Sequence, residues 1–453
     1  MAQTAPRSSP PGPAGRAGIS PFRVRRDPLG LLVGLQRAHG DVVAFRVGPQ
    51  RVWLLSDPDL IRELLVARHR ETVKGRALQE ARRVVGDGLL TSEGERHLRQ
   101  RRLIQPVFHQ ERIAGYGAAM VDHADRAVDR WRSGEALDAA AEMQRLALAI
   151  VGETLFGADV EAEAPEVGAA LTTAFAAFDR YLIPFSGLLR RLPLPVNRRV
   201  AAAEARLERV LAGMIDSRRR APGGDDLLSL LLAARDEDGT GMDDRQVRDE
   251  AMTIFIAGHE TTALALGWTW ALLGRDAGVE ARLHEELDRV LDGRPPTVDD
   301  LPSLTYTRAC VAEAMRLYPP AWVMGRKTTV DVPLGDWLLP AGTVAVASQW
   351  IVHRDPRWWP EPERYRPERW LEERGDGPRL AYFPFGAGPR ICVGERFAWM
   401  EAILLLATIG RRVRLRPAPG EELDPRAMLT LRPRRGLAMV PEARTPVPTG
   451  AAA

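Results

Sequence analysis

The chain has 453 residues, of which 45% are hydrophobic and 27% are charged, so it can bury a large core and is neither disordered nor fibrous. Its 63 basic and 60 acidic residues leave a formal charge of only +3, so nucleic acid is not expected as a partner. The two cysteines, Cys310 and Cys392, are too few for a disulfide scaffold and are typical of a reducing compartment, which predicts a cytoplasmic protein.

The first 20 residues contain no continuous apolar stretch, so we expect a disordered leader over 1–20 and no signal peptide or membrane anchor. Two alternating segments, DVVAFRVG and RVWLLS, then predict paired strands. The segment SDPDLIRELLV predicts a helix with Ser56 or Asp57 as its cap and Pro58 in its first turn.

The region from about Gly94 to Arg316 has mainly helical periodicity. Its longest apolar segment, Met252–Gly274, is long enough to cross a bilayer. His259 and Glu260 lie near its middle, where an unpaired acid would be costly in lipid. The segment is therefore predicted to be a buried helix that carries a functional acid.

Strands return after Tyr318, and the proline-rich segment 355–370 predicts an irregular coil. A last helix is expected over 395–411. No internal repeat or long Gly/Ser linker divides the chain. We therefore expect a mainly α protein with small β-sheets, with one large domain over 21–440 and a flexible tail over 441–453.

The loop FGAGPRICVG places three glycines around Cys392. Glycine adopts positive φ at little cost, so Gly386, Gly388 and Gly394 allow backbone amides to approach one sulfur. The helix that follows would direct its positive end at a thiolate. The geometry suits a metal ligand, although a lone cysteine is often simply buried in the core, as we expect for Cys310.

These residues form F-G-x-G-x-R-x-C-x-G, which resembles the haem-binding loop of the cytochrome P450 monooxygenases of the soluble bacterial type. The resemblance implies the cytochrome P450 fold and haem b, iron protoporphyrin IX, as cofactor. It implies that Cys392 is the axial iron ligand, that Phe385 packs beside the sulfur, and that Arg390 pairs with a haem propionate.

The segment AGHETT, residues 257–262, resembles the family's oxygen-activating motif. Splitting O2 requires protons, and a dry pocket needs a relay, so Glu260 and Thr261 are predicted to be catalytic. Gly258 would leave room for oxygen. His259 has no partner ligand at i+4 and is predicted to make a structural contact rather than bind a metal.

Glu313 and Arg316 form E-x-x-R on one helical face, and alone this pair would be commonplace. Together with PERW at 367–370, they resemble the family's buried Glu-Arg-Arg arrangement, with Arg369 as the third member. A buried charge cluster is better explained by fixing geometry than by adding stability, so these three residues are predicted to be structural.

The haem propionates need positive partners. His97 and Arg101 lie one helical turn apart and resemble the family's propionate pair, and Arg326 matches another propionate arginine. Arg99 and Arg102 lie off that face. They are either solvated or part of a basic patch that receives an acidic electron-transfer protein.

The resemblance implies that one atom of O2 is inserted into a substrate while the other leaves as water. No Gly-rich dinucleotide fingerprint follows a strand, so electrons are expected from a ferredoxin and an NAD(P)H-dependent ferredoxin reductase, and we expect a monomer. A peroxide-driven peroxygenase is the alternative within the class, and a non-catalytic haem-binding sensor is the alternative outside it.

The segments expected to line the substrate pocket carry few charges, which favours an apolar small molecule. Phe255, Ala257 and Val323 are predicted to line it, with the segments 78–90, 181–189 and 428–431. The strings DGLLTSEGERHLRQRRLIQPVFH and RLPLPVNRR resemble actinobacterial terpene oxygenases of secondary metabolism, notably the pentalenene-oxidising kind. A fatty acid is the alternative substrate.

Overall fold

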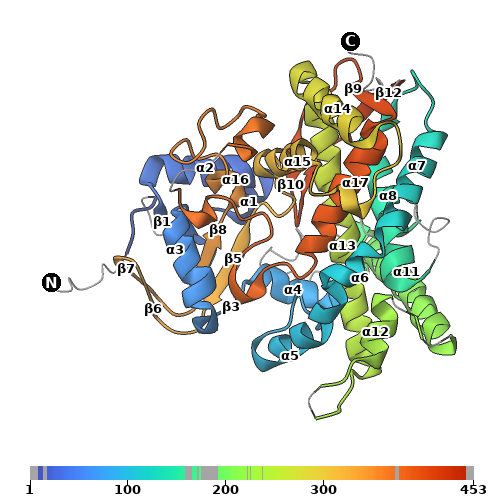
Figure 1. Ribbon diagram of the computed structural model, residues 1–453. Helices are drawn as coiled ribbons and strands as arrows, with labels where there is room; N and C mark the ends of the chain where they lie inside the picture. Colours follow the sequence, from blue (N-terminus) through green and yellow to red (C-terminus); the bar gives the residue numbers. More distant parts are fainter. Residues whose placement is uncertain are drawn as a thin grey trace.

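The computed structural model describes residues 9–13, 18–158, 166–170, 173–174, 192–221, 223–224, 226–236, 238–372 and 377–444. The N-terminal helices and the largest sheet form one side of the molecule, and the long helices pack on the other side (Figure 1). The fold is mainly helical with small sheets, as predicted. The predicted pocket segment 181–189 lies outside the described residues.

The longer helices are α2 (Pro28–His39), α4 (Arg76–Val85), α5 (Gly94–Ile104), α7 (Gly117–Arg130), α8 (Ala139–Phe156), α11 (Pro195–Arg220), α13 (Asp244–Leu273), α14 (Ala277–Leu291), α15 (Thr305–Leu317) and α17 (Glu395–Gly410). The short ones are α1 (Pro21–Arg26), α3 (Pro58–Arg62), α6 (Gln110–Ala114), α12 (Leu227–Ala233) and α16 (Gln349–Val352). Single turns of other helix types are η1 (Glu63–Ala67), η2 (His69–Glu71), η3 (Gln105–Phe108), η4 (Val298–Asp300), η5 (Pro367–Trp370), η6 (Arg379–Ala381) and η7 (Gly388–Arg390).

The largest sheet has the order β1-β2-β8-β5-β3. Its strands are β1 (Val42–Val47), β2 (Gln50–Leu55), β8 (Val344–Ala347), β5 (Met324–Thr328) and β3 (Thr72–Lys74). The other sheets are β4-β12-β9, β10-β11 and β6-β7. Their strands are β4 (Leu137–Asp138), β12 (Ala438–Ala443), β9 (Val413–Pro417), β10 (Pro425–Ala427), β11 (Leu431–Pro433), β6 (Val332–Leu334) and β7 (Trp337–Leu339).

The first predicted elements are confirmed. β1 and β2 pair antiparallel, and the chain then enters α3 with Pro58 in its first turn. Asp57 rather than Ser56 is the cap, because its Oδ1 accepts the backbone N–H groups of Asp59 and Leu60 at 2.9 and 3.0 Å. These elements follow from local signals, since an alternating pattern favours a half-buried strand and an acid at the cap accepts free N–H groups.

The two ends of the described chain contact the main body. Within the range expected as a leader, Pro11 O accepts the backbone N–H of Ala44 at 2.9 Å, and Ile19 forms a β-bridge with Val47. At the other end, β12 continues to Ala443, three residues beyond the expected domain boundary. Backbone pairing therefore holds both ends against sheets.

Helix α13 runs through the helical part of the molecule (Figure 1) and packs on α8, α15 and α17. It contains the apolar segment for which a membrane span was the alternative. No helix in the described ranges is long and apolar enough to cross a bilayer. Trp268 and Trp270, near its end, are almost completely buried, so this segment contributes to the protein core.

Candidate active site

Cys392 lies just before the N-terminus of α17, which begins at Glu395 as predicted. Its backbone N–H donates to Phe385 O at 3.0 Å, which closes the loop. The Cys392 side chain is exposed. Surrounding protein nevertheless raises the pKa of its thiol to about 11, while the Gly394 N–H that donates to the sulfur favours the thiolate. The thiolate therefore requires a further positive partner, which an iron ion would supply.

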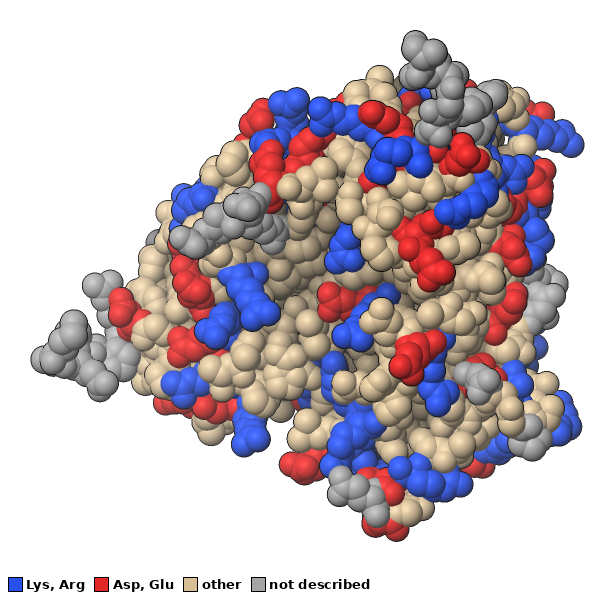
Figure 2. Space-filling model, viewed as in Figure 1, with Lys and Arg blue, Asp and Glu red and all other residues tan. Residues whose placement is uncertain are grey.

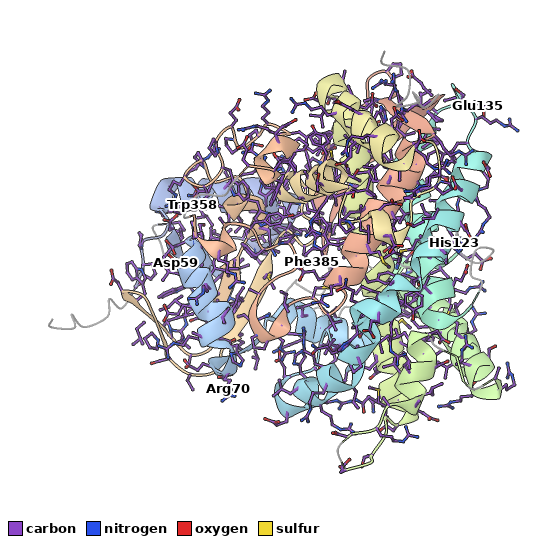
Figure 3. The ribbon with its side chains drawn as sticks, viewed as in Figure 1. Asp59, Arg70, His123, Glu135, Trp358 and Phe385 are labelled. Atoms are coloured by element: carbon purple, nitrogen blue, oxygen red, sulfur yellow. The ribbon has the colours of Figure 1, made fainter. Side chains whose placement is uncertain are left out.

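Two glycines shape this loop. Gly386 and Gly388 have φ values of 78° and 69°, which residues with a Cβ rarely adopt. A Cβ on Gly388 would also lie 2.4 Å from Leu65 O, so the loop rests directly on backbone. Figure 3 shows Phe385, at the start of the loop, near the middle of the molecule. Its ring packs against Trp399, with centroids 5.8 Å apart.

Five basic side chains from four separate elements gather beside this loop. Lys74 and Arg326 are partners across β3 and β5, and His97 and Arg101 come from α5. Arg390 comes from the loop itself, and Arg101 Nη1 donates to Ile391 O at 2.7 Å. The structure therefore brings together all four predicted propionate partners, and it adds Lys74.

The basic groups repel one another. Burial and then Arg390, Lys74, Arg101 and Arg326 lower the pKa of His97 to about 3. Burial and then Arg390 lower the pKa of Arg326 to about 10. Such an excess of buried positive charge is costly without an anion. Two propionates would supply the missing negative charge, so these residues fit haem.

Sequence reasoning missed Lys74. Burial first, and then Arg390, lower the pKa of its ammonium group to about 7, whereas Glu93 raises it. Glu93 also pairs with Arg390. One signal was available: Lys74 is one of only two lysines, in a chain whose other permanently charged basic residues are arginines. Its place beside Arg326 depends on a pairing between strands far apart in sequence.

One patch of α13 keeps accessible surface within a helix that is otherwise largely buried. Ala257 is exposed, and Gly258 and Thr261 are half-buried. These positions share one helical face, because residues three and four apart lie together. Thr261 Oγ1 donates to Ala257 O at 2.9 Å, so the hydroxyl oxygen keeps its acceptor capacity toward this face. We call Ala257, Gly258 and Thr261 the open patch.

Glu260 contacts a strand rather than Thr261. Its Oε1 accepts Thr430 Oγ1 at 2.5 Å and Arg432 Nε at 2.7 Å, and Arg432 Nη2 lies 2.5 Å from the same oxygen. Glu260 is only 2% exposed. The acid and the alcohol are thus neighbours in sequence, but the acid is held by β11 and by the turn before it.

The predicted pocket residues separate in the structure. Ala257 belongs to the open patch, and Val323 is half-buried. Phe255 is instead a core residue, 3% exposed, with its ring edge-on to Phe156 at 5.5 Å. Helix geometry explains the correction: Phe255 precedes Ala257 by two residues, which is about 200° around the axis. His259 Nδ1 lies 2.8 Å from Phe255 O, which is the structural contact expected of it.

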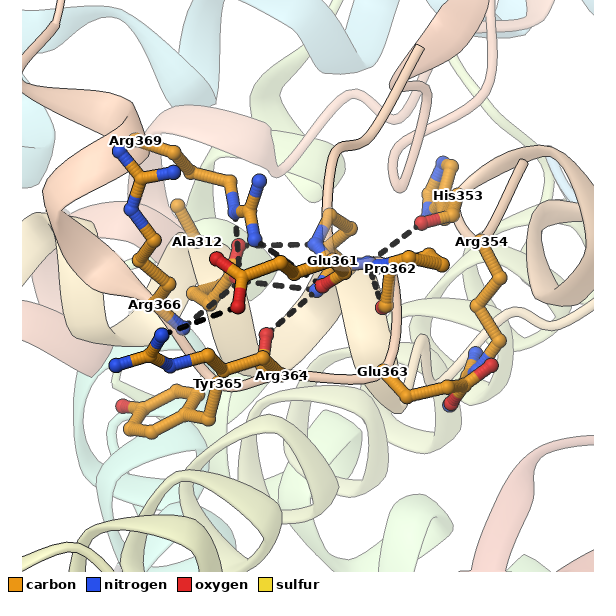
Figure 4. A network of polar contacts seen from close by, with 12 residues as sticks. Ala312, His353, Arg354, Glu361, Pro362, Glu363, Arg364, Tyr365, Arg366 and Arg369 are labelled. Carbon is orange, nitrogen blue, oxygen red and sulfur yellow. Dashed lines mark hydrogen bonds and ion pairs between the residues drawn. The ribbon is translucent and has the colours of Figure 1, made fainter. Parts of the chain in front are cut away.

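The structure brings Glu313, Arg316 and Arg369 together in one buried network, and Figure 4 shows Arg369 in it together with Pro362 and His353. Glu313 Oε1 lies 2.9 Å from Arg316 Nη2 and from Arg369 Nε, and Trp370 Nε1 donates to Oε2 at 2.8 Å. Arg316 also donates to His353 O and Pro362 O at 2.8 and 2.7 Å. Side chains therefore fix the proline-rich coil to α15.

Arg99 is 29% exposed, and its guanidinium group is held by residues of the same protein. Its Nε lies 2.6 Å from Asp236 Oδ2, and its Nη1 donates to Gln246 Oε1 at 3.3 Å. Nη2 donates to Thr240 O at 3.2 Å. Arg99 therefore anchors the connection before α13. The sequence did not predict this role because the partners of Arg99 lie far from it along the chain.

Glu401 of α17 is a second buried acid near the motif on α13. Neither of its carboxylate oxygens has a hydrogen-bond partner among the described residues. Burial raises the pKa of this carboxyl to about 8, opposed by the nearby Thr262 hydroxyl. Glu401 is therefore neutral at pH 7, which a sequence pattern alone does not indicate.

This raised pKa predicts a pH effect on stability. The folded state holds a proton on Glu401 between about pH 4.5 and 8 and the unfolded state does not, so the free energy of unfolding falls as pH rises, by up to about 1.4 kcal/mol per pH unit. Glu401→Gln removes this contribution. Urea unfolding should show that, between pH 6 and pH 8, the free energy of unfolding of the variant rises by about 2 kcal/mol relative to that of the wild type. A constant difference would contradict the assignment.

Comparison with known proteins agrees with this geometry. The family model described as cytochrome P450 matches residues 9–441. The chain is 41% identical to cyclooctatin synthase of Streptomyces melanosporofaciens over 92% of both chains. It is 42% identical to cyclooctat-9-en-7-ol 5-monooxygenase of the same organism, over 88% of this chain and 87% of the relative.

Pentalenene oxygenase of Streptomyces avermitilis is 39% identical over 94% of this chain and 95% of the relative. The predicted resemblance to actinobacterial terpene oxygenases is thereby confirmed. The cysteine loop, the basic cluster beside it and the open patch on α13 lie within the matched range. The chain belongs to the cytochrome P450 family and is a haem-dependent monooxygenase.

Proposed function

We propose that this enzyme oxidises a terpene, by inserting one atom of O2 into a C–H or C=C bond, and that its cofactor is haem b. The observation that carries the proposal is the cysteine loop with its basic cluster: one thiol at a helix N-terminus and five basic groups beside it, with Glu93 paired to Arg390. This donor set matches an iron porphyrin with two propionates.

Cys392 would hold the iron, and Lys74, His97, Arg101, Arg326 and Arg390 would hold the propionates. When bound, the haem supplies the iron at which O2 is activated. The protein supplies the rest: the Gly394 N–H donates to the sulfur, and hydrogen bonds to a ligating sulfur tune the metal. The positive end of the α17 dipole also stabilises the negative charge of the thiolate.

Protons would reach the reaction through α13. Thr261 Oγ1 is accessible and donates to Ala257 O, so its lone pairs can hold a water molecule. Glu260 can take up a proton and pass it to that water, provided that its carboxyl turns from Arg432 toward Thr261. A relay of this kind contributes where bulk water is excluded.

Thr261→Ala is expected to retain haem and substrate binding but to uncouple electron use from product. With a typical general acid–base contribution of about 100-fold, most of the NAD(P)H consumed should yield hydrogen peroxide or water. Thr269→Ala is the matched control, because Thr269 Oγ1 donates to Ala265 O at 2.7 Å on the same helix but is fully buried. If Thr261→Ala were as tightly coupled as the control, Thr261 would have no part in the relay.

The substrate proposal has two supports. The relatives are named for cyclooctatin, cyclooctat-9-en-7-ol and pentalenene, and the open patch presents a methyl group, a glycine and one hydroxyl. An apolar substrate is bound by area and shape rather than by ion pairs. A terpene hydrocarbon or terpene alcohol meets these requirements.

Electrons would come from a ferredoxin, reduced by an NAD(P)H-dependent reductase. Arg102, Arg112 and Arg396 are exposed on α5, α6 and α17, the helices beside the cysteine loop. Figure 2 shows basic side chains gathered over the region of α5. An acidic partner would be attracted to this side by charge complementarity.

Spectral titration of the haem-loaded protein tests the substrate class. Pentalenene and cyclooctat-9-en-7-ol should shift the Soret band of the haem-loaded protein at micromolar concentration, whereas fatty acids should not. A response to fatty acids alone would identify a fatty-acid hydroxylase instead. Turnover should require ferredoxin and reductase. Turnover with peroxide only would identify a peroxygenase, and no turnover with either would leave a sensor role.

A further inference from the structure

The segment Gly86–Leu90, between α4 and α5, is held by buried side chains from three other elements. Two adjacent acids of α13 accept its backbone N–H groups. Asp249 Oδ2 accepts Asp87 N at 2.8 Å, and Glu250 Oε2 accepts Leu89 N at 2.7 Å. Both acids are at most 1% exposed.

Two further side chains donate to carbonyl groups of the same segment. Lys74 Nζ donates to Leu89 O at 3.2 Å and also to Leu90 O. Gln100 Nε2 of α5 donates to Asp87 O at 2.7 Å. We call Lys74, Gln100, Asp249 and Glu250 the loop clamp. Acids accept from its N–H groups and donors bind its carbonyl groups, so side chains satisfy these buried backbone groups of the connection.

The segment also touches the backbone of α13. A Cβ on Gly88 would lie 2.4 Å from Thr253 Oγ1 and 2.5 Å from Asp249 O. Gly86 has a φ of 73°, and a Cβ there would lie 2.0 Å from Asp249 Oδ1. Only glycine fits at either position, so the loop lies as close to the helix as a backbone can.

Burying the polar groups of the loop clamp costs free energy. Glu250 Oε1 has no hydrogen-bond partner among the described residues, and burial raises the pKa of this carboxyl to about 8. A buried polar cluster of this kind adds little stability compared with apolar packing, and its use is to fix geometry.

Helix periodicity indicates which geometry the loop clamp fixes. Glu250 and Ala257 are seven residues apart, which is almost two full turns, so they share one face of α13 about 10 Å apart. The backbone N–H of Leu89 therefore lies against the same face that becomes the open patch two turns later. A distance of about 10 Å is comparable with the length of a small polycyclic hydrocarbon.

We propose that Asp249 and Glu250 are positioning residues for substrate selection, which act through the backbone of Asp87 and Leu89 to fix where Leu89 and Leu90 end the substrate space. The proposal rests on the proposed function, because it takes the open patch as the oxygen side of the pocket. The ligand class is an apolar molecule whose length is limited by this wall.

Azole titration of the haem-loaded protein tests the proposal, because an azole that binds the iron probes space without turnover. Imidazole reports the iron alone, and 4-phenylimidazole also probes the surrounding space. Glu250→Leu should change the ratio of their dissociation constants at least about 10-fold, the effect of one or two methylene-sized changes in a pocket. Glu250→Gln keeps an acceptor for Leu89 N and should retain the wild-type ratio. Glu280→Leu is the matched control. It removes another buried acid, which lies on α14 and pairs with Arg416 at 2.7 Å, and it should also retain the wild-type ratio.

Gly88→Ala gives an independent test if Glu250→Leu does not fold. Its Cβ pushes the loop away from Thr253 while all four clamp residues stay unchanged, so it should alter the same ratio and speed hydrogen exchange of the Leu89 amide. A wild-type ratio in a folded Glu250→Leu or Gly88→Ala protein would overturn the proposal. Absence of a thiolate spectrum in the wild type would instead overturn the proposed function, so the two failures are distinguishable.

Discussion

Cys392→Ala is expected to abolish the thiolate spectrum and the monooxygenase activity of the haem-loaded protein. Replacing residues that only orient a metal ligand typically costs 10–100-fold, so loss of the ligand itself should cost more than about 100-fold. The Gly394 N–H and the N-terminus of α17 would then face no sulfur. The measurement is the carbon monoxide difference spectrum of the reduced variant, together with product formation.

Cys310→Ala is the matched control. Cys310 is fully buried in α15, and burial raises the pKa of its thiol well above the usual range. Its loss should leave the spectrum unchanged and lower the free energy of unfolding by about 1–2 kcal/mol, through a small cavity. If activity survived in Cys392→Ala or disappeared in Cys310→Ala, the assignment of Cys392 as the iron ligand would be wrong.

Glu313→Ala is expected to produce the largest loss of stability. It removes the acid between Arg316 and Arg369 and leaves two guanidinium groups buried without their carboxylate. Breaking a buried pair in this way typically costs about 3–5 kcal/mol. Because the same network holds the coil before the cysteine loop, the variant should also release haem faster. Urea unfolding and haem transfer to apomyoglobin measure the two effects.

Glu135→Ala is its control. Glu135 lies at the edge of the molecule (Figure 3), 3.6 Å from Arg132, with both side chains more than 60% exposed. Such a surface pair contributes about 0–1 kcal/mol. Equal losses in the two variants would mean that the buried network has no special role.

The parts of the fold that could be predicted from the sequence depend on neighbours in the chain. The β1–β2 pair follows from alternation, the start of α3 from Asp57 and Pro58, and the start of α17 from the glycines around Cys392. The contact between Glu313 and Arg316 follows from their spacing on one helix. Such local patterns predict the structure correctly because the tertiary packing at these positions agrees with the local preference.

The features that were missed depend on residues far apart in sequence. Lys74 joins the basic cluster because β3 pairs with β5. Glu260 meets Arg432 across 172 residues, and Glu250 meets Leu89 across 161 residues. The error at Phe255 was different, since helix periodicity was available and indicates a face away from Ala257.

The carbon monoxide difference spectrum of the reduced, haem-loaded wild type tests most directly whether Cys392 ligates the iron as a thiolate. One sulfur at the N-terminus of α17, stabilised by the Gly394 N–H and neighboured by Arg101, should give the long-wavelength Soret band characteristic of a thiolate ligand. A band at the shorter wavelength of a histidine-ligated or thiol-ligated haem, in freshly purified and folded protein, would contradict the assignment of the active site.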